Sequence, residues 1–338
     1  MVQFYPDDFS RFDKFRIFRT TYKTVSSHAL TTDVLVPIHL LDDTTTTPQQ
    51  PSRPPSPLLL RFHGGGLIAG SSLFPDFFAP WQLSLAQRHS AIIVSPNYRL
   101  LPESTVADIL ADIEDFWTWI HASLQTFLAQ QTGPAAAAIR VDTGRIITSG
   151  DSAGGYLSLQ LGLSHADGIR AVTAAYPMVD VLSRHFTEAY EKRMFDVPQL
   201  PRSFIDEHLE KVRTGALPNV VSEDKRFERG PLMFAMTQDG FCREYFPRER
   251  RELFPLERVG SGGERFPRGG VFVWHGRQDS IVPVEGSVKL EEVVKRIDPG
   301  AKFRLTIRDG DHGFDGESSV DDEWMAEGLK GIVDAWLA

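Results

Sequence analysis

The stretch Gly150-Asp151-Ser152-Ala153-Gly154 decides the fold of this 338-residue chain. Arg145-Ile146-Ile147-Thr148 before it predicts a strand, and the helix-like run at 155–161 after it predicts a helix. In a strand–turn–helix of the form Gly-x-Ser-x-Gly, the tight turn forces the serine into a strained conformation, and larger side chains two positions away would collide. The strain holds the hydroxyl out above the sheet, and the helix directs its positive end toward it. Ser152 is therefore the candidate nucleophile.

Strand and helix patterns alternate along most of the chain. Alternating patterns first predict strands at 16–25 and 29–41. Mainly apolar runs, which suit strands buried on both faces, follow at 58–62, 91–95, 171–175, 271–274 and 303–307. Helical spacing of apolar residues occurs at 106–127, 283–297 and 320–337. This order predicts an α/β fold with a mostly parallel, doubly wound sheet.

Two intervals interrupt the alternation. Residues 42–57 are rich in Thr, Pro, Gln and Ser and cannot bury an apolar face, so we expect a mobile surface loop. Residues 181–269 show only helical fragments, at 184–193 and 203–211, and are too many for a simple loop. The expected organisation is a core built from 1–180 and 270–338, with a cap inserted at 181–269.

A serine nucleophile needs a base, and the base needs an orienting carboxylate. Asp279 follows the late strand pattern at 271–274, and His312 follows the one at 303–307. Each residue thus lies just beyond the carboxyl end of an expected parallel strand, the edge where such sheets build their sites. The chain order Ser152, Asp279, His312 is the order of an α/β-hydrolase triad.

Other residues compete for these roles. His275 is expected to close the end of a strand, whereas His312 combines a loop after a strand, a flanking glycine and the last position in the chain order. Asp309 and Asp311 lie too close in sequence to His312 to come from a different strand, so Asp279 is preferred as the acid.

Acyl transfer also needs donors for the oxyanion that develops on the substrate. His63-Gly64-Gly65-Gly66 follows the strand pattern at 58–62, and residues without side chains let backbone N–H groups approach a substrate oxygen. We expect three donors: Gly64, Gly65 and Ala153. The nearby apolar residues are expected either to contribute to the pocket or to pack in the core: Leu67, Ile68, Phe74, Phe77 and Phe78.

Together these segments resemble the hormone-sensitive-lipase-like esterases of the α/β-hydrolase superfamily. The further matching segments are Asn97-Tyr98-Arg99-Leu100-Leu101-Pro102-Glu103 and Asp311-His312-Gly313-Phe314. The resemblance implies a sheet of about eight strands, a helical cap and ester hydrolysis without a cofactor. It assigns Ser152, Asp279 and His312 as the triad and gives Arg99 a structural role.

Composition narrows the class of protein. The net charge of −9 makes a nucleic-acid partner an unfavoured hypothesis. The single cysteine, Cys242, forbids an internal disulfide, and no signal peptide or apolar run long enough to anchor the chain in a membrane is apparent. We expect a cytoplasmic protein with no metal or other cofactor and a small-molecule ester as partner. The oligomeric state stays open, a homodimer included.

These observations predict a serine hydrolase that cleaves a small or medium hydrophobic carboxylic ester through an acyl-enzyme. An alternative is a specialised biosynthetic enzyme that uses the same site for lactonisation, acyl transfer or condensation on one metabolite. A non-catalytic ligand receptor is a third hypothesis, and the presence of a complete Ser152, Asp279 and His312 set argues against it.

Overall fold

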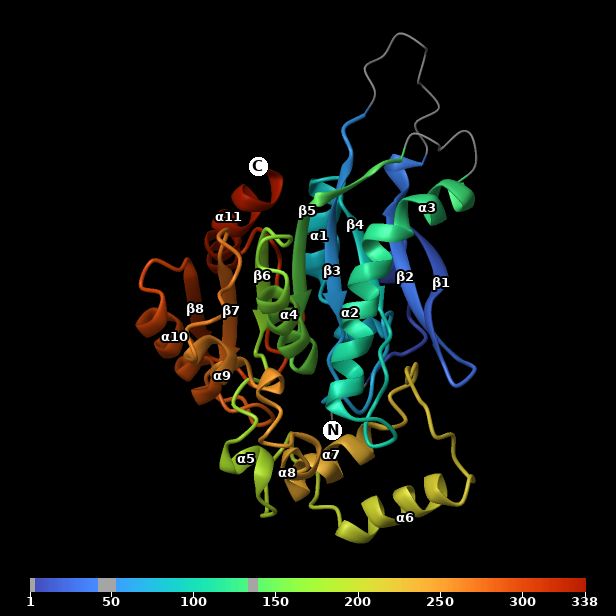
Figure 1. Ribbon diagram of the computed structural model, residues 1–338, viewed down its shortest axis with the longest axis vertical. Helices are drawn as coiled ribbons and strands as arrows, with labels where there is room; N and C mark the ends of the chain where they lie inside the picture. The colour runs from blue at the N-terminus through green and yellow to red at the C-terminus, as the bar shows by residue number, and fades with distance from the viewer. Residues whose placement is uncertain (1–3, 42–52, 133–138) are drawn as a thin grey trace.

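A central sheet organises the chain, whose computed structural model describes residues 4–41, 53–132 and 139–338. Its eight strands lie in the order β1-β2-β4-β3-β5-β6-β7-β8 (Figure 1). They are β1 (Phe15–Val25), β2 (His28–Pro37), β3 (Ser56–Phe62), β4 (Ile92–Pro96), β5 (Val141–Gly150), β6 (Ala171–Ala175), β7 (Val271–Gly276) and β8 (Phe303–Arg308). The pairs β1–β2 and β2–β4 are antiparallel, and all pairs from β4 to β8 are parallel. The predicted mostly parallel sheet is confirmed.

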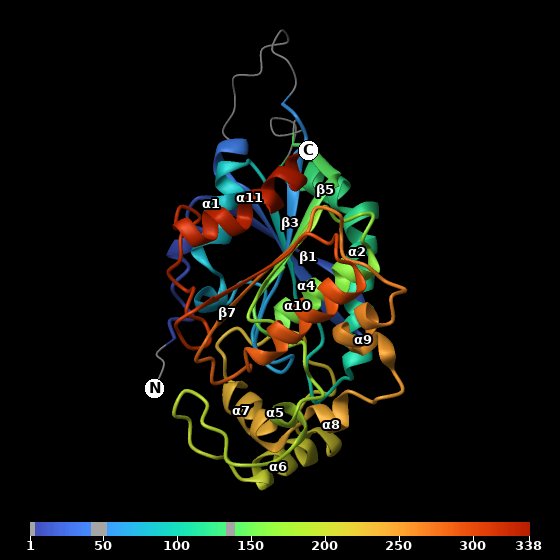
Figure 2. The ribbon, with the colours of Figure 1, turned by 90° about the vertical axis from the view of Figure 1, so that its left-hand side faces the viewer.

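Helices cover both faces of the sheet, which explains why the central strands are mainly apolar. Every residue of β3, β4, β6 and β7 is buried. One face carries α1 (Pro80–Arg88) and α11 (Glu323–Leu337), and the other carries α2 (Val106–Ala122), α4 (Ala153–Ser164) and α10 (Glu285–Ile297) (Figure 2). Alternate residues of a strand therefore enter two separate cores, as Leu58 and Leu59 do.

Several short helices lie beyond one end of the sheet (Figure 1). They are α5 (Arg184–Thr187), α6 (Arg202–Arg213), α7 (Gly230–Asp239) and α8 (Cys242–Tyr245), while α9 (Pro255–Gly260) packs against α10 and α4. The helix expected at 184–193 ends at Thr187 because Glu188 is extended. The buried Lys192 ammonium instead donates to three backbone carbonyls, of Glu188, Thr237 and Gln238, at 2.7–2.9 Å.

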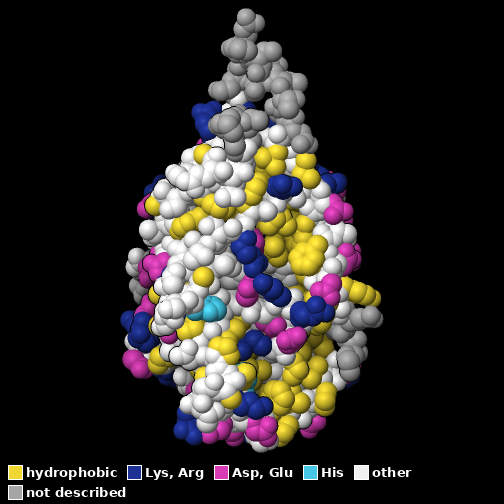
Figure 3. Space-filling model, turned by 90° about the vertical axis from the view of Figure 1, so that its right-hand side faces the viewer, with side chains coloured by type: hydrophobic (Ala, Val, Ile, Leu, Met, Phe, Trp, Pro, Cys, Tyr) yellow, Lys and Arg dark blue, Asp and Glu magenta, His cyan; other side chains and the backbone are white. Residues whose placement is uncertain are grey.

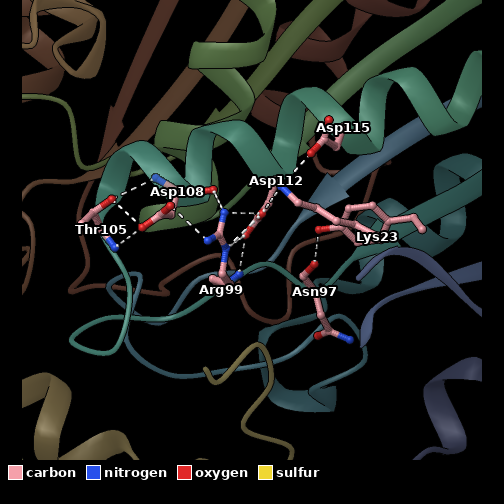
Figure 4. Close-up of polar contacts among 8 residues, drawn as sticks. Lys23, Asn97, Arg99, Thr105, Asp108, Asp112 and Asp115 are labelled. Atoms are coloured by element: carbon pink, nitrogen blue, oxygen red, sulfur yellow. Dashed lines mark hydrogen bonds and ion pairs between the residues drawn. The ribbon is translucent and has the colours of Figure 1, made fainter. Parts of the chain in front are cut away.

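An ion-pair cluster connects β1, the segment after β4 and α2 (Figure 4). Asp112 is fully buried and accepts from the Arg99 guanidinium at 2.8–3.1 Å and from the Arg99 amide at 3.0 Å. Lys23 reaches the same carboxylate at 2.8 Å, and Asp108 pairs with Arg99 at 3.0 Å. Buried charges are stable only when they are paired in this way. The structure thus places Arg99 in a cluster that holds three elements together.

Three further segments differ from the sequence prediction. The strand expected at 29–41 ends at Pro37, and Ile38–Leu40 form a 3-10 helix. Most of the loop expected at 42–57 lies outside the described residues, but Ser56 begins β3, since its amide donates to the Arg140 carbonyl at 2.7 Å. The helix expected at 106–127 is divided at Ser123, after which α3 (Leu124–Thr132) begins.

Charges of both signs lie among hydrophobic side chains on the face shown in Figure 3. Within the described residues, no helix combines the length and the apolar character needed to cross a membrane.

Candidate active site

Ser152 lies on the turn between β5 and α4 with φ 56° and ψ −117°, a left-handed conformation that is strained for a residue with a Cβ atom. The Ser152 amide donates to the Ala175 carbonyl at 2.9 Å, which anchors the turn to β6. A Cβ at Gly150 would lie 2.2 Å from the Gly154 oxygen, and one at Gly154 would lie 2.1 Å from the Phe62 oxygen. Both glycines are therefore required by close backbone approach.

His312 and Asp279 are brought together by the loops after β8 and β7. His312 Nδ1 lies 2.8 Å from Asp279 Oδ2. The other oxygen, Oδ1, accepts from the amides of Ile281 and Val282 at 2.9 and 2.8 Å. An ionised carboxylate can only accept, so this contact keeps a proton on Nδ1 and leaves Nε2 of neutral His312 as an acceptor.

The two side chains shift each other's titration. Burial alone would raise the pKa of the Asp279 carboxyl, but the His312 charge and hydrogen bonds from His275 and His312 hold it well below its usual range. Burial lowers the pKa of His312, yet the Asp279 charge and hydrogen bond outweigh this, so the pKa lies above its ordinary value. Asp279 is thus charged at neutral pH and stabilises the imidazolium.

The competing residues have other partners. Asp311 accepts from the Ser280 amide at 2.7 Å and from the His312 backbone amide at 2.7 Å, so it shapes the loop without bonding the imidazole. Asp309 is exposed and pairs with Arg277 at 3.1 Å. His275 is buried at the end of β7, where Nδ1 lies 2.8 Å from Ser287 Oγ and Nε2 lies 2.9 Å from the Val282 oxygen. The same Nε2 lies 3.2 Å from Asp279 Oδ2, so His275 supports the acid but does not line the cavity.

Ser152 and His312 line one cavity of about 290 Å³ at the carboxyl end of the parallel strands. Much of its wall comes from apolar side chains outside the sheet: Phe4, Phe77, Phe186, Phe195, Phe227 and Met233. Phe4 precedes β1 by more than ten residues and packs edge-on against Phe77 and Phe227, with ring centroids at 5.7 and 5.0 Å. Sequence reasoning missed Phe4, because nothing local indicates where that arm folds.

Of the five apolar residues expected near the glycine loop, Phe77 lines the cavity and the others do not. Leu67, Ile68 and Phe78 are buried in the two cores, and Phe74 is buried behind the aromatic rings of the cavity wall. The turn explains the difference, because the Gly65 carbonyl accepts from the amides of Ile68 and Ala69 at 2.9 Å and folds this segment back. For these four residues the structure thus supports burial, the second of the two expected roles.

The glycine loop presents a different pair of residues from the expected pair. Gly65 and Gly66 line the cavity with φ 105° and 65°, whereas Gly64 packs against Asp151. A Cβ on Gly64 would lie 2.3 Å from Asp151 Oδ2, and its amide faces that carboxyl. Ala153 is the first residue of α4, so its amide has no partner within the helix. Gly66 therefore lines the cavity and Gly64 does not, while the oxyanion donors stay a prediction.

A buried ion pair between Arg61 and Asp151 packs against the glycine loop. Arg61 Nη2 lies 3.1 Å from Asp151 Oδ1, and its guanidinium stacks 4.5 Å from the Phe78 ring. Burial raises the pKa of Asp151 to about 6, although the Arg61 charge opposes the shift. Sequence reasoning missed Arg61, yet a basic residue within the apolar strand at 58–62 was a usable signal, because a buried charge requires a partner.

The fold and the elbow define an α/β hydrolase. Residues 59–247, more than half of the chain, match the sequence model of the family described as alpha/beta hydrolase fold, and the chain belongs to this family. Within the described residues, no three His, Cys, Asp or Glu side chains are grouped so that they could hold a metal ion.

Three relatives illustrate the similarity. Probable carboxylesterase M8 from Phoma sp. is 29% identical over 339 residues, covering 97% of this chain and 98% of that protein. Non-reducing polyketide synthase Preu6 from Preussia isomera is 27% identical over 349 residues, covering 95% of this chain but 15% of the synthase. The structure of the esterase Est2 from Thermogutta terrifontis with propionate bound has a TM-score of 0.55 at 19% identity, covering 96% and 94% of the two chains. That last likeness shows the fold.

Proposed function

We propose that this protein is a carboxylesterase-type serine hydrolase that cleaves a small or medium hydrophobic ester. The main evidence is that Ser152, on its strained turn, lines the same cavity as His312. His312 Nδ1 is in turn hydrogen-bonded to the buried Asp279. The names of the carboxylesterase relatives support the same activity.

The reaction has two steps. Ser152 Oγ attacks the ester carbonyl while His312 Nε2 takes its proton, and the oxygen of the tetrahedral intermediate accepts from the amides of Gly65, Gly66 and Ala153. His312 then gives the proton to the departing alcohol, which leaves an acyl ester on Ser152. Water, deprotonated by His312, releases the acid and restores the hydroxyl. Asp279 stabilises the imidazolium in both steps.

The surroundings of the site support further proposals. Residues 181–269 act as the cap, since Phe186, Met233 and Phe234 from this segment line the cavity, although α9 packs beside the sheet. The partner is a small-molecule ester and not a nucleic acid, and the location is cytoplasmic, with the buried Cys242 as a free thiol.

Replacement of Ser152 tests the function. Ser152→Ala should reduce kcat for p-nitrophenyl butanoate by about 10⁴ or more, because removal of a triad nucleophile has effects of that order. Near-wild-type turnover by this variant would refute the proposal.

A biosynthetic acyl transferase is the second candidate. Its supporting observation is the similarity of almost the whole chain to part of a polyketide synthase. An activated ester offered with competing alcohols separates the two, because a transferase yields new esters in preference to free acid.

A further inference from the structure

The cavity has a polar region that the proposed mechanism does not use. Gln82 from α1 and Asp315 from the loop after β8 both line it, and they are 3% and 1% exposed. Asp151 also lines the cavity and acts on Asp315 electrostatically. The aromatic rings beside these groups belong to Trp81, Trp274 and Tyr176.

Each of the two side chains uses one polar atom in the fold and leaves the other free. Gln82 Nε2 donates to Ser149 Oγ at 2.8 Å, and Gln82 Oε1 is buried without a partner. Asp315 Oδ2 accepts from Trp274 Nε1 at 2.8 Å, and the Tyr176 hydroxyl also interacts with this carboxyl. Asp315 Oδ1 is buried and has no partner at hydrogen-bond geometry. Buried polar atoms are almost always satisfied, so two free atoms in one cavity indicate a ligand group that satisfies them.

The aromatic walls indicate the shape of that ligand group. Trp81 and Trp274 meet edge-on with centroids at 5.4 Å, which places α1 beside β7 and so joins the Gln82 and Asp315 sides of the cavity. Flat apolar walls with a few fixed polar atoms are typical of sites that orient a planar ring.

We propose that this polar region is a specificity subsite for a hydroxyl-bearing aromatic ring in the acid or alcohol part of the ester. The inference rests on the proposed function. A hydroxyl both donates and accepts, so it can serve Asp315 Oδ1 and can pair with Gln82 in either orientation of its amide. A charged ammonium group fits this region less well, because it can only donate hydrogen bonds. In addition, the Arg61 guanidinium already pairs with the neighbouring Asp151.

The test compares matched esters. The acyl pair is 4-nitrophenyl 3-phenylpropanoate and its 4-hydroxyphenyl analogue, and the alcohol pair is phenyl butanoate and 3-hydroxyphenyl butanoate. In wild-type protein, kcat/KM for at least one hydroxylated ester should exceed that of its partner by about tenfold, the effect of one hydrogen bond to a charged or buried group. An aminomethyl analogue of each hydroxylated ester, charged at neutral pH, tests the cationic alternative.

Two substitutions then locate the effect. Gln82→Leu removes the free amide atom, and Asp315→Asn keeps an oxygen for Trp274 while placing an NH2 group where Oδ1 was. Each substitution should bring the ratio of kcat/KM between the hydroxylated ester and its unsubstituted partner close to one. Because the ratio is measured within a single protein, partial misfolding cancels. Met233→Leu on the apolar wall is the matched control and should leave the ratio as it is in the wild type.

The outcomes distinguish the inference from the proposed function. A wild-type ratio of one or less in both pairs, or preference for an aminomethyl ester over its hydroxylated analogue, would overturn the subsite. A ratio that survives both substitutions would overturn it as well. If no ester is hydrolysed and Ser152 resists a fluorophosphonate label, the proposed function itself has failed.

Discussion

Replacement of Asp279 by asparagine changes the chemistry of His312 while leaving the loop intact. Asp279 Oδ1 accepts from the amides of Ile281 and Val282, so the asparagine oxygen keeps this position and its NH2 group turns toward His312. His312 Nδ1 must then accept, and the ring proton moves to Nε2. Ser152 consequently loses its base, because Nε2 can no longer take a proton.

The expected loss follows from this change of tautomer. An asparagine in the orienting position of a serine triad lowers kcat by about 10⁴, or about 5 kcal/mol in activation free energy. KM for p-nitrophenyl butanoate should change little, since Asp279 does not line the cavity. Stopped-time hydrolysis at high enzyme concentration measures kcat, and urea unfolding checks that the variant is folded.

Asp311→Asn is the matched control, because Asp311 binds the loop amides of Ser280 and His312 and not the imidazole. We expect it to lose less than about tenfold in kcat. Asp279→Asn within tenfold of wild type, or equal losses in the two variants, would refute the assignment of the orienting acid.

Three further predictions follow. Because the Asp279 charge outweighs burial and raises the His312 pKa, kcat/KM should rise with pH through an apparent pKa above 6.5, since only the neutral ring accepts a proton; a midpoint below 6.5 contradicts this. Gly154→Ala puts a Cβ 2.1 Å from the Phe62 oxygen and should destabilise the protein by about 3 kcal/mol or more in urea unfolding; an unchanged midpoint contradicts the elbow geometry. Trp336→Phe removes the indole donor from the buried Leu58 carbonyl and the partly buried Arg145 carbonyl and should cost about 1–3 kcal/mol by the same measurement, whereas a neutral change would show that they find other partners.

The sheet was predictable because its strands are buried on both faces. The run at 58–62 is apolar except for Arg61, and such a short apolar run is typical of a strand buried on both faces, as β3 is. The pairing of Asp279 with His312 was also accessible, since each follows a parallel strand and such strands end at a common edge. The order of the residues along the chain and the direction of the parallel strands can both be inferred from the sequence.

Features set by contacts distant in sequence were not predictable. Helix α1 is nine residues long and is stabilised by buried side chains such as Trp81 more than by its own periodicity. Gln82 reaches the cavity only because that helix packs beside β7. That Gly66 and not Gly64 lines the cavity depends on the backbone dihedrals at Gly65 and Gly66, which the sequence of three glycines does not specify.

The central claim is that an acyl group passes through Ser152. The most direct measurement is mass spectrometry of the protein quenched in acid within its first turnovers of p-nitrophenyl butanoate, followed by peptide mapping. We predict one butanoyl adduct, located on Ser152 and absent from Ser152→Ala. Hydrolysis of the ester with no adduct, or with the acyl group on another residue, would contradict the account.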